Sequence, residues 1–373
     1  MKRWGLLAVA LAALALCGAA EASAPSVLAR AYIVQSSVDG RTLAARDADT
    51  PRPMASITKL MTVLVALERL KLDDVVTVSP VAARVGESTL DLEAGETLTV
   101  RDLVIGALVP SANDAATELA IAAAGSVPRF VAAMNSKARA LGLTGTHYEN
   151  PHGLDQPGHH STARDIATLL RVALRNPVIR RYAALPRATL SSGRVVESTD
   201  NLIATVPGIV GAKTGHTDLA GWAQVAFARV GRVGITAAVL GDPSEAARDA
   251  DLAALLRFGL ASYRPSRVVD ANRTYASIPV GWGETPLRVV APRAIVRPAP
   301  VDRPLVERVV VPAVAALPVR AGQRLGTLVV QDGGRVVVRS PLVAAAARSE
   351  PGALAKADWL AGRTLHHLVG LVS

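Results

Sequence analysis

A serine and a lysine three positions apart are the first residues of this chain whose types and spacing suggest shared chemistry. Ser56 precedes Lys59, and the segment from Leu60 to Leu70 that follows is almost continuously apolar. Such a segment is typical of a buried helix, on which residues three apart share a face. We therefore expect Lys59 in a pocket at the mouth of that helix. The alternative for a Ser-x-x-Lys tetrad, which also arises by chance, is a helix cap followed by a solvated lysine.

Lys59 can serve a serine nucleophile only if it loses its charge. A serine hydroxyl needs a neighbouring base to attack an amide carbonyl. Free lysine has a pKa of about 10.4, so holding it neutral at pH 7 costs about 4.6 kcal/mol. Burial and a second nearby cation produce shifts of that size. We predict that Lys213 is this second cation and that it also helps to bind an anionic end of the substrate.

Two further short motifs complete the candidate site. Ser111 and Asn113 form one, and Lys213, Thr214 and Gly215 form the other. We predict that Ser111 relays a proton to a leaving amine and that the side-chain amide of Asn113 holds the substrate backbone. Each motif is weak by itself, and the hypothesis depends on all three occurring in this order.

The elements that must position these residues fall into two regions that differ in predicted secondary structure. Residues 26–262 predict a mixed α and β domain, with helices and strands as follows: a hairpin around Asp39 and Gly40; helices over 60–70, 112–124, 128–141 and 244–260 and after Thr162; strands over 209–214, 222–228 and 234–240. Ten of the 23 prolines lie between Pro265 and Pro341, separated by short β-branched runs. Because helices do not tolerate that proline density, residues 265–345 predict a small all-β sandwich domain.

The two ends of the chain predict export and a surface helix. Lys2 and Arg3 precede an apolar run and then small residues, the pattern of a secretory signal peptide over residues 1–22. Lipidation of Cys17, the only cysteine, is an alternative that the bulky Leu16 before it disfavours. Residues 353–373 carry apolar side chains at steps of three and four and predict an amphipathic helix. Its charges prevent it from spanning a bilayer, so we expect it to lie on a membrane or to dock on the β domain.

Charge and composition limit the partners. The formal net charge is +10, which suits anionic lipid or wall polymers, but aromatic residues are only 3% and no nucleic-acid motif occurs. We expect no nucleic-acid partner. The paired histidines His159–His160 and His366–His367 lack the ligand spacing of a metal site, so neither a metal nor any other cofactor is expected.

The three motifs, their order and their spacing resemble the penicillin-recognising serine enzymes. Within that group the chain resembles the low-molecular-mass penicillin-binding proteins, the serine-type D-alanyl-D-alanine carboxypeptidases of peptidase family S11. The segments that carry this likeness are Thr146–Asp155, Ser161–Asp165, Gly211–Thr217, Gly326–Leu328 and Pro341–Ala344. The resemblance runs from about residue 26 to the C-terminus. It implies an α+β fold with a β-lactamase/transpeptidase-like catalytic domain, in which helices flank an antiparallel sheet.

The resemblance also implies roles for individual residues. Ser56 forms an acyl-enzyme with Lys59 as general base, while Ser111 and Asn113 line the opposite wall of the cleft. The substrate lies along Lys213, Thr214, Gly215 and His216, and the backbone N–H groups of Ser56 and His216 form an oxyanion hole. Arg248 matches an arginine that receives the substrate carboxylate with Thr214. The alternative for Arg248 is an exposed helix-surface arginine.

The sequence departs from the family in two places and leaves rival functions open. Asp200 stands where the family usually has an asparagine, and the β domain has Ala321–Gln323 where the family often has Gly-Asp. A β-lactamase shares the motifs, but no Glu-x-x-Leu-Asn-type segment lies between Asn113 and Lys213 to activate a deacylating water. An endopeptidase with the same site and a non-catalytic wall-binding protein are two more rival functions. The implied partners are the peptidoglycan stem peptide as substrate, β-lactams as inhibitors and a membrane surface, on the periplasmic side of the bacterial inner membrane.

Overall fold

The computed structural model describes residues 7–12, 24–282 and 284–369. It divides into two compact units, of which one spans Ala22–Ser262 and the other begins at Tyr263 and also takes in the N-terminal segment. We call them the α+β unit and the β unit. Each is described by itself.

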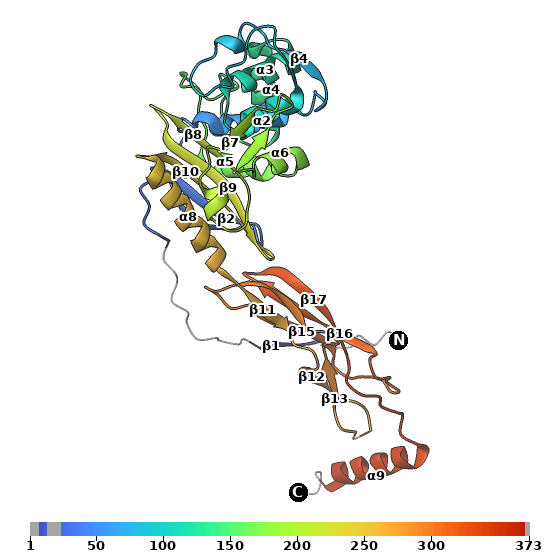
Figure 1. The fold of residues 1–373 in the computed structure, drawn as a ribbon. Coiled ribbons are helices and arrows are strands. Elements are labelled where there is room, and N and C mark those ends of the chain that lie inside the picture. The colour runs from blue at the N-terminus through green and yellow to red at the C-terminus, as the bar shows by residue number, and fades with distance from the viewer. Residues whose placement is uncertain (1–6, 13–23, 283, 370–373) are drawn as a thin grey trace. The chain divides into compact units, whose positions relative to one another are not determined.

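A five-stranded antiparallel sheet forms the centre of the α+β unit (Figure 1). Its strand order is β3-β2-β10-β9-β8. The strands are β2 (Ala31–Ser36), β3 (Thr42–Arg46), β8 (Ile209–Thr217), β9 (Gly221–Val230) and β10 (Val233–Asp242). The hairpin predicted around Gly40 joins β2 to β3 and turns at that glycine with φ of +80°. The predicted antiparallel sheet is therefore confirmed.

Helices cover both faces of this sheet. Helix α8 (Glu245–Ala261) lies so close to one face that a Cβ on Gly259 would come within 2.6 Å of Ile235 and 2.9 Å of Val34. The other helices and short strands of the unit are α1 (Lys59–Ala66), α2 (Val100–Leu108), α3 (Asn113–Ala124), α4 (Val127–Ala140), α5 (Ala163–Ala173), α6 (Pro177–Tyr182), α7 (Leu202–Thr205), β4 (Val75–Thr77), β5 (Thr97–Thr99), β6 (Arg187–Thr189) and β7 (Val195–Glu197), with 3-10 turns η1 (Ala55–Thr58) and η2 (Ala82–Arg84).

Helix α1 begins at Lys59, one residue before the predicted range, and ends earlier than predicted. Ser56 lies in η1, ahead of the helix, and α1 ends at Ala66 rather than at Leu70. The apolar run continues only as far as Leu67, and the polar Glu68 and Arg69 turn the chain to the surface. Every residue of α1 is buried, as its composition predicts.

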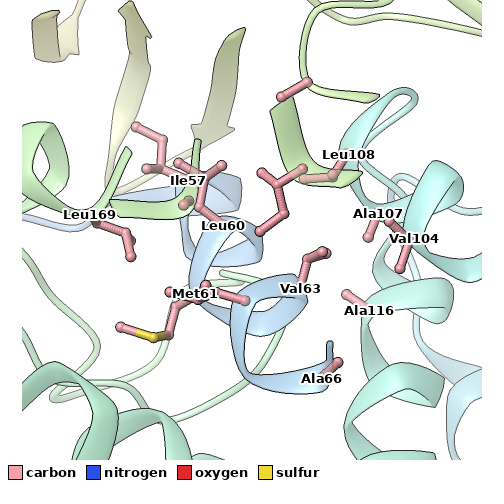
Figure 2. Close-up of a cluster of buried hydrophobic side chains, with 14 of the residues drawn as sticks. Ile57, Leu60, Met61, Val63, Ala66, Val104, Ala107, Leu108, Ala116 and Leu169 are labelled. Carbon is pink, nitrogen blue, oxygen red and sulfur yellow. The ribbon is translucent and has the colours of Figure 1, made fainter. Parts of the chain in front are cut away.

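Helix α1, which carries Lys59 and follows Ser56, is surrounded by the apolar core. Figure 2 shows α1 in the middle of apolar side chains contributed by several elements. The labelled residues are Ile57, Leu60, Met61, Val63 and Ala66 of η1 and α1, Val104, Ala107 and Leu108 of α2, Ala116 of α3, and Leu169 of α5. Because α5 also packs against β2, β9 and β10, the helix that carries Lys59 is fixed to the sheet through α5.

The β unit is built from a six-stranded sheet and a two-stranded ribbon (Figure 1). The sheet has the order β1-β15-β16-β17-β13-β12, and the ribbon pairs β11 with β14. Their bounds are β1 (Leu7–Ala12), β11 (Tyr263–Val269), β12 (Thr274–Ile278), β13 (Leu287–Val290), β14 (Ile295–Pro300), β15 (Val306–Pro312), β16 (Arg324–Asp332) and β17 (Arg335–Ala344). Its apolar core includes Val289, Leu328 and Leu342. The predicted all-β second domain is confirmed.

Both ends of the chain belong to the β unit. Strand β1 lies within the predicted signal peptide and pairs with β15, so that β1 is an edge strand of the sheet. The signal peptide stays a prediction. Residues 353–369 form helix α9, and none of the helices in the described part of the chain is long and apolar enough to cross a membrane.

Candidate active site

The backbone of Ser56 is clamped between two close-packed glycines. Ala55, directly before it, has φ of +49°, a conformation that side-chain-bearing residues seldom adopt. A Cβ on Gly153 would come within 2.0 Å of the Ala55 carbonyl oxygen, and one on Gly215 would come within 2.9 Å of the Ser56 nitrogen. The loop around residue 153 and strand β8 therefore fix the position of Ser56 from two sides.

Lys59 has three hydrogen-bonding neighbours, and their chemistry orients its amine. Its Nζ lies 2.6 Å from Ser56 Oγ, 2.6 Å from Asn113 Oδ1 and 2.9 Å from the carbonyl oxygen of His152. Asn113 donates from Nδ2 to the carbonyl oxygen of Gly86 at 3.0 Å, which identifies the atom facing Lys59 as its oxygen. The Asn113 and His152 oxygens can only accept. A neutral amine has two protons for these two acceptors, and its lone pair then faces the hydroxyl of Ser56.

The surroundings of Lys59 favour that neutral form. The side chain is completely buried, and its pKa is lowered well below the usual range, first by burial and then by the positive charge of Lys213. Asp114 and Glu87 act in the opposite direction with smaller effects. The sequence-based expectation that Lys213 is the second cation agrees with this order of causes.

Ser111 and Lys213 form the second half of the site. Lys213 donates to Ser111 Oγ at 2.8 Å and to the carbonyl oxygen of Thr214 at 3.0 Å. Ser111 is buried and has φ of +66°, so the fold holds it in a strained conformation where its hydroxyl meets Lys213. Burial lowers the pKa of Lys213 to about 7; Asp200 raises it and Arg248 lowers it further.

Strand β8 carries Thr214, Gly215 and His216, three further predicted residues, one after another. The hydroxyl of Thr214 lies 2.6 Å from that of Thr199, and Gly215 lies against the backbone of Ser56. His216 is exposed, and its ring stacks on Trp222 with 4.2 Å between centroids. The sequence did not identify Thr199 and Trp222 as site residues, because a single threonine in a loop and an aromatic residue in a strand belong to no recognisable motif.

Arg248 is buried rather than exposed on its helix. Only 1% of the residue is accessible, its guanidinium carbon lies 5.4 Å from the centroid of the Trp222 ring, and its hydrogen bonds go to Asp249 and Glu245. The helix-surface alternative is therefore wrong. The guanidinium is not hydrogen-bonded to Thr214, with which the sequence analysis paired it.

The loop after Tyr148 supports the site through its backbone. Asn150 accepts from the N–H of Gly153 at 2.7 Å and donates to the carbonyl oxygen of Leu154 at 2.9 Å. This arrangement presents the His152 carbonyl to Lys59. Burial, and then the neighbouring Lys59 when it is protonated, lower the pKa of the His152 side chain to about 3. The Asn-Pro-His-Gly run was visible in the sequence, but a backbone acceptor has no side-chain signature.

Within the described residues, no group of three His, Cys, Asp or Glu side chains is arranged to hold a metal ion. The chemistry that the site offers is that of its own side chains: a serine hydroxyl facing a buried lysine amine whose pKa is lowered, a second hydroxyl held by another buried lysine, and a strand edge beside both.

Comparison with known proteins places this geometry in a family. The family model described as D-alanyl-D-alanine carboxypeptidase, Peptidase S11, matches residues 19–244. The D-alanyl-D-alanine carboxypeptidase DacF of Bacillus subtilis is 32% identical over 318 residues, 82% of each chain, and DacC of Escherichia coli is 33% identical over 343 residues, 86% of this chain and 84% of that one.

Solved structures agree with the sequence relatives. Penicillin-binding protein 5 from Haemophilus influenzae aligns with a TM-score of 0.66 and 26% identity, over 88% of this chain and 99% of that chain. Penicillin-binding protein 6B from Escherichia coli aligns with a TM-score of 0.66 and 29% identity, over 87% and 98%. These alignments extend well beyond the α+β unit. The chain belongs to the D-alanyl-D-alanine carboxypeptidase family of serine hydrolases, Peptidase S11.

Proposed function

We propose that the protein removes the terminal D-alanine from the peptidoglycan pentapeptide through an acyl-enzyme on Ser56. Ser56 Oγ attacks the carbonyl carbon between the two D-alanines, and its proton passes to Lys59. The terminal D-alanine leaves as an amine after receiving a proton through Ser111. Water then hydrolyses the ester and returns Ser56 to its starting state.

The observation that carries this proposal is the orientation of the Lys59 amine. Asn113 Oδ1 and the His152 carbonyl oxygen can only accept, so the two amine protons point toward them and the lone pair points toward Ser56. Because burial and Lys213 lower the pKa of Lys59, the enzyme has its base ready before substrate arrives. A serine beside a solvated, charged lysine would have no such base.

The opposite wall and the strand supply substrate binding. Asn113 holds Lys59 and lines the cleft, and the edge of strand β8 from Thr214 to His216 binds the substrate backbone. The N–H groups of Ser56 and His216 form the oxyanion hole, which in acyl transfer is worth about 10²–10³ in rate for each donor. Lys213 and Thr214 bind the substrate carboxylate. Arg248 lies 5.4 Å from the centroid of the Trp222 ring, and its guanidinium binds Asp249 and Glu245. For Arg248 to receive the carboxylate together with Thr214, these ion pairs must open when the substrate binds.

The same site accepts β-lactams, which present a reactive amide and a carboxylate in one small molecule. Between Asn113 and Lys213 the sequence has no Glu-x-x-Leu-Asn-type segment for a deacylating water. The penicillin adduct on Ser56 is therefore long-lived, and hydrolysis of β-lactams is slow. An endopeptidase activity on cross-linked stems uses the same catalytic residues and depends only on how the cleft accommodates a longer leaving group.

The decisive experiment is mass spectrometry of a D-Ala-D-Ala pentapeptide incubated with wild-type, Ser56→Ala and Lys59→Met protein. The wild type should release one D-alanine, Ser56→Ala none, and Lys59→Met at least about 10³-fold less, the size of a general-base contribution. A fluorescent penicillin should label only the chain with Ser56 intact. A wild type that turns over penicillin quickly and leaves the pentapeptide uncut would make the protein a β-lactamase instead.

The enzyme acts outside the cytoplasmic membrane, held at its periplasmic surface. The signal peptide predicted over residues 1–22 supports export, and helix α9 supports attachment. Trp359 of α9 packs edge-on against Trp282 of the β unit with 5.5 Å between centroids, a contact that favours the docking alternative. Leu354 and Leu360 of the same helix are 85% and 50% exposed, and these apolar side chains support the membrane alternative. Deleting residues 353–373 should move the protein from the membrane to the soluble fraction, and an unchanged distribution would contradict the attachment.

A further inference from the structure

A buried histidine outside the three motifs is connected to the backbone of the nucleophile. His159 lies in the loop after Gly158 and is only 5% exposed. Its two ring nitrogens are both in hydrogen-bonding contact, Nδ1 with the backbone nitrogen of Glu149 at 3.0 Å and Nε2 with Thr58 Oγ1 at 2.8 Å. Thr58 is the third residue of the Ser56–Lys59 tetrad. The histidine therefore touches the tetrad at a residue for which the proposed chemistry has no use.

These hydrogen bonds form a series from Glu149 to Ala55. The direction of each one follows from the first donor, the Glu149 N–H, and the last acceptor, the Ala55 oxygen. The Glu149 N–H can only donate, so Nδ1 of His159 accepts and the single proton of the neutral ring is on Nε2. Nε2 then donates to Thr58, whose own hydroxyl proton goes to the carbonyl oxygen of Ala55 at 2.8 Å. Burial lowers the pKa of His159 to about 4, which agrees with a neutral ring at neutral pH.

The last acceptor in the chain belongs to the peptide that carries the Ser56 N–H. A peptide unit is planar, and in the trans form its C=O and N–H point in opposite directions. Holding the Ala55 oxygen in place therefore fixes the direction of the Ser56 N–H, which points the opposite way from the same peptide. The peptide needs such support because Ala55 has φ of +49°, a conformation that costs on the order of 1–3 kcal/mol unless the surroundings enforce it.

We propose that His159, acting through Thr58, is a positioning residue for the oxyanion hole. The chain of hydrogen bonds holds the Ala55–Ser56 peptide so that the Ser56 N–H meets the oxygen that becomes charged during acylation. The inference rests on the proposed function of Ser56. It predicts a specific kinetic consequence, because an oxyanion donor acts on the transition state and contributes little to the binding of the ground state.

Stopped-flow acylation by a fluorescent penicillin separates binding from chemistry. His159→Asn keeps an acceptor near the position of Nδ1 and removes the donor to Thr58, and Thr58→Val preserves the shape and removes both hydroxyl bonds. Each should lower the acylation rate constant by roughly 10- to 100-fold, part of the effect of losing a donor, and leave the penicillin Kd within about threefold. His159→Gln, which places an amide N–H near Nε2, and Thr58→Ser should both stay near the wild-type rate.

The double variant and a neighbour provide the controls. If the two residues act through one chain, Thr58→Val combined with His159→Asn should be no slower than the slower single variant. His160→Asn, whose side chain is outside the chain of hydrogen bonds, should acylate like the wild type. Thermal unfolding of every variant verifies folding, and Thr58→Val decides the question if His159→Asn does not fold.

The outcomes distinguish this inference from the proposed function. Wild-type protein that penicillin does not acylate on Ser56 would refute the proposed function. Wild-type protein that is acylated normally, with Thr58→Val and His159→Asn at the same rate, would refute only the positioning role. A rise in Kd as large as the fall in rate would also overturn it, since the residues would then shape the cleft rather than the oxyanion hole.

Discussion

The α+β unit and the β unit place their charged side chains differently. Residues 22–262 contain 24 Lys and Arg against 23 Asp and Glu, whereas residues 263–373 contain 15 against 7, so almost all of the positive charge of the mature chain lies in the second region. The α+β unit nevertheless buries Lys59, Lys213 and Arg248. Among the described residues from Tyr263 onward, Asp332 is the only charged side chain that is buried.

The difference shows what each unit is built for. A buried ionisable group costs free energy unless it is paired or loses its charge, so a fold that buries several is less stable than it could be. The α+β unit needs these buried groups, because a lysine keeps a lowered pKa, and a hydroxyl keeps a fixed orientation, only in a hydrogen-bonded site that excludes water. The β unit has an apolar core with arginines outside, so its surface is basic and attracts anionic groups.

Matched glycine substitutions test this comparison with the largest expected effect. Gly153→Ala places a methyl group 2.0 Å from the Ala55 oxygen at φ of +100°, whereas Gly334→Ala, in the β16–β17 turn at φ of +84°, meets nothing within 4 Å. Gly153→Ala should cost about 3 kcal/mol or more and abolish acylation by penicillin. Gly334→Ala should cost about 1 kcal/mol, from backbone strain alone, with acylation unchanged. Calorimetry and penicillin labelling measure the two effects.

Equal destabilisation by these two substitutions would break the comparison. It would mean that positive φ, which the two glycines share, determines the loss of stability, and that the contact with Ala55 adds nothing to it. An acylation rate that survives Gly153→Ala would mean that the backbone of Ser56 can shift without loss of function.

A second test uses the pH dependence of anion binding in the two units. Because burial lowers the pKa of Lys213 to about 7, the free cleft loses this positive charge as the pH rises through that value. The second-order rate constant of acylation reports the free enzyme, so it should fall by about tenfold for each pH unit above 7. The arginines of the β unit stay charged throughout this range, so retention on an anionic resin should not change.

Lys213→Arg is the matched variant for this test. Its guanidinium stays charged, so the fall on the alkaline side should disappear while the overall rate drops because Ser111 loses its partner at 2.8 Å. An alkaline fall that persists unchanged in Lys213→Arg would assign it to another group.

The sequence predicted the elements and the catalytic residues well because both have local signatures. Apolar runs, caps and glycine turns give the helices and strands, and Ser56, Lys59, Ser111 and Lys213 are found through motifs. Thr162, predicted to cap a helix, accepts from the N–H of Asp165 at 3.1 Å at the start of α5. The predicted end of α1 was wrong because Leu67 and Leu70 continue the apolar pattern beyond Ala66, where the helix ends.

What the sequence could not predict depends on contacts between distant segments. The sequence analysis considered His159 only as a metal ligand. The structure buries it and brings it to Thr58, from which it is separated by 101 positions in the sequence. The role of the His152 carbonyl depends on a backbone atom, and the ion pairs of Arg248 depend on which side of α8 faces the sheet. Positive φ at Ala55 and Ser111 likewise has no signature, because neither residue type prefers it.

The smallest predicted effect compares one buried aspartate from each unit. Asp242 in the α+β unit faces Asp251, whose carboxylate accepts from the N–H groups of Leu28 and Ala29 at 2.5 and 2.9 Å. Burial, and then Asp251, raise the pKa of Asp242 to about 8. A carboxyl group whose pKa is raised in the folded state costs stability progressively as the pH rises from about 4 to about 8. Asp332 in the β unit is instead bound by Arg303, with 2.7 Å between Oδ2 and Nη2.

The same substitution should therefore have opposite signs in the two units. Asp242→Asn removes a charge that the fold opposes, so at pH 9 it should stabilise the α+β unit by about 1–2 kcal/mol, with almost no change at pH 4. Asp332→Asn breaks a partly exposed ion pair and should destabilise the β unit by about 1 kcal/mol at pH 9. Calorimetry at both pH values separates the two transitions. If Asp242→Asn destabilises at pH 9, the ionised Asp242 is satisfied by Arg46 and Arg248 after all, and the α+β unit carries less electrostatic strain than its buried charges indicate.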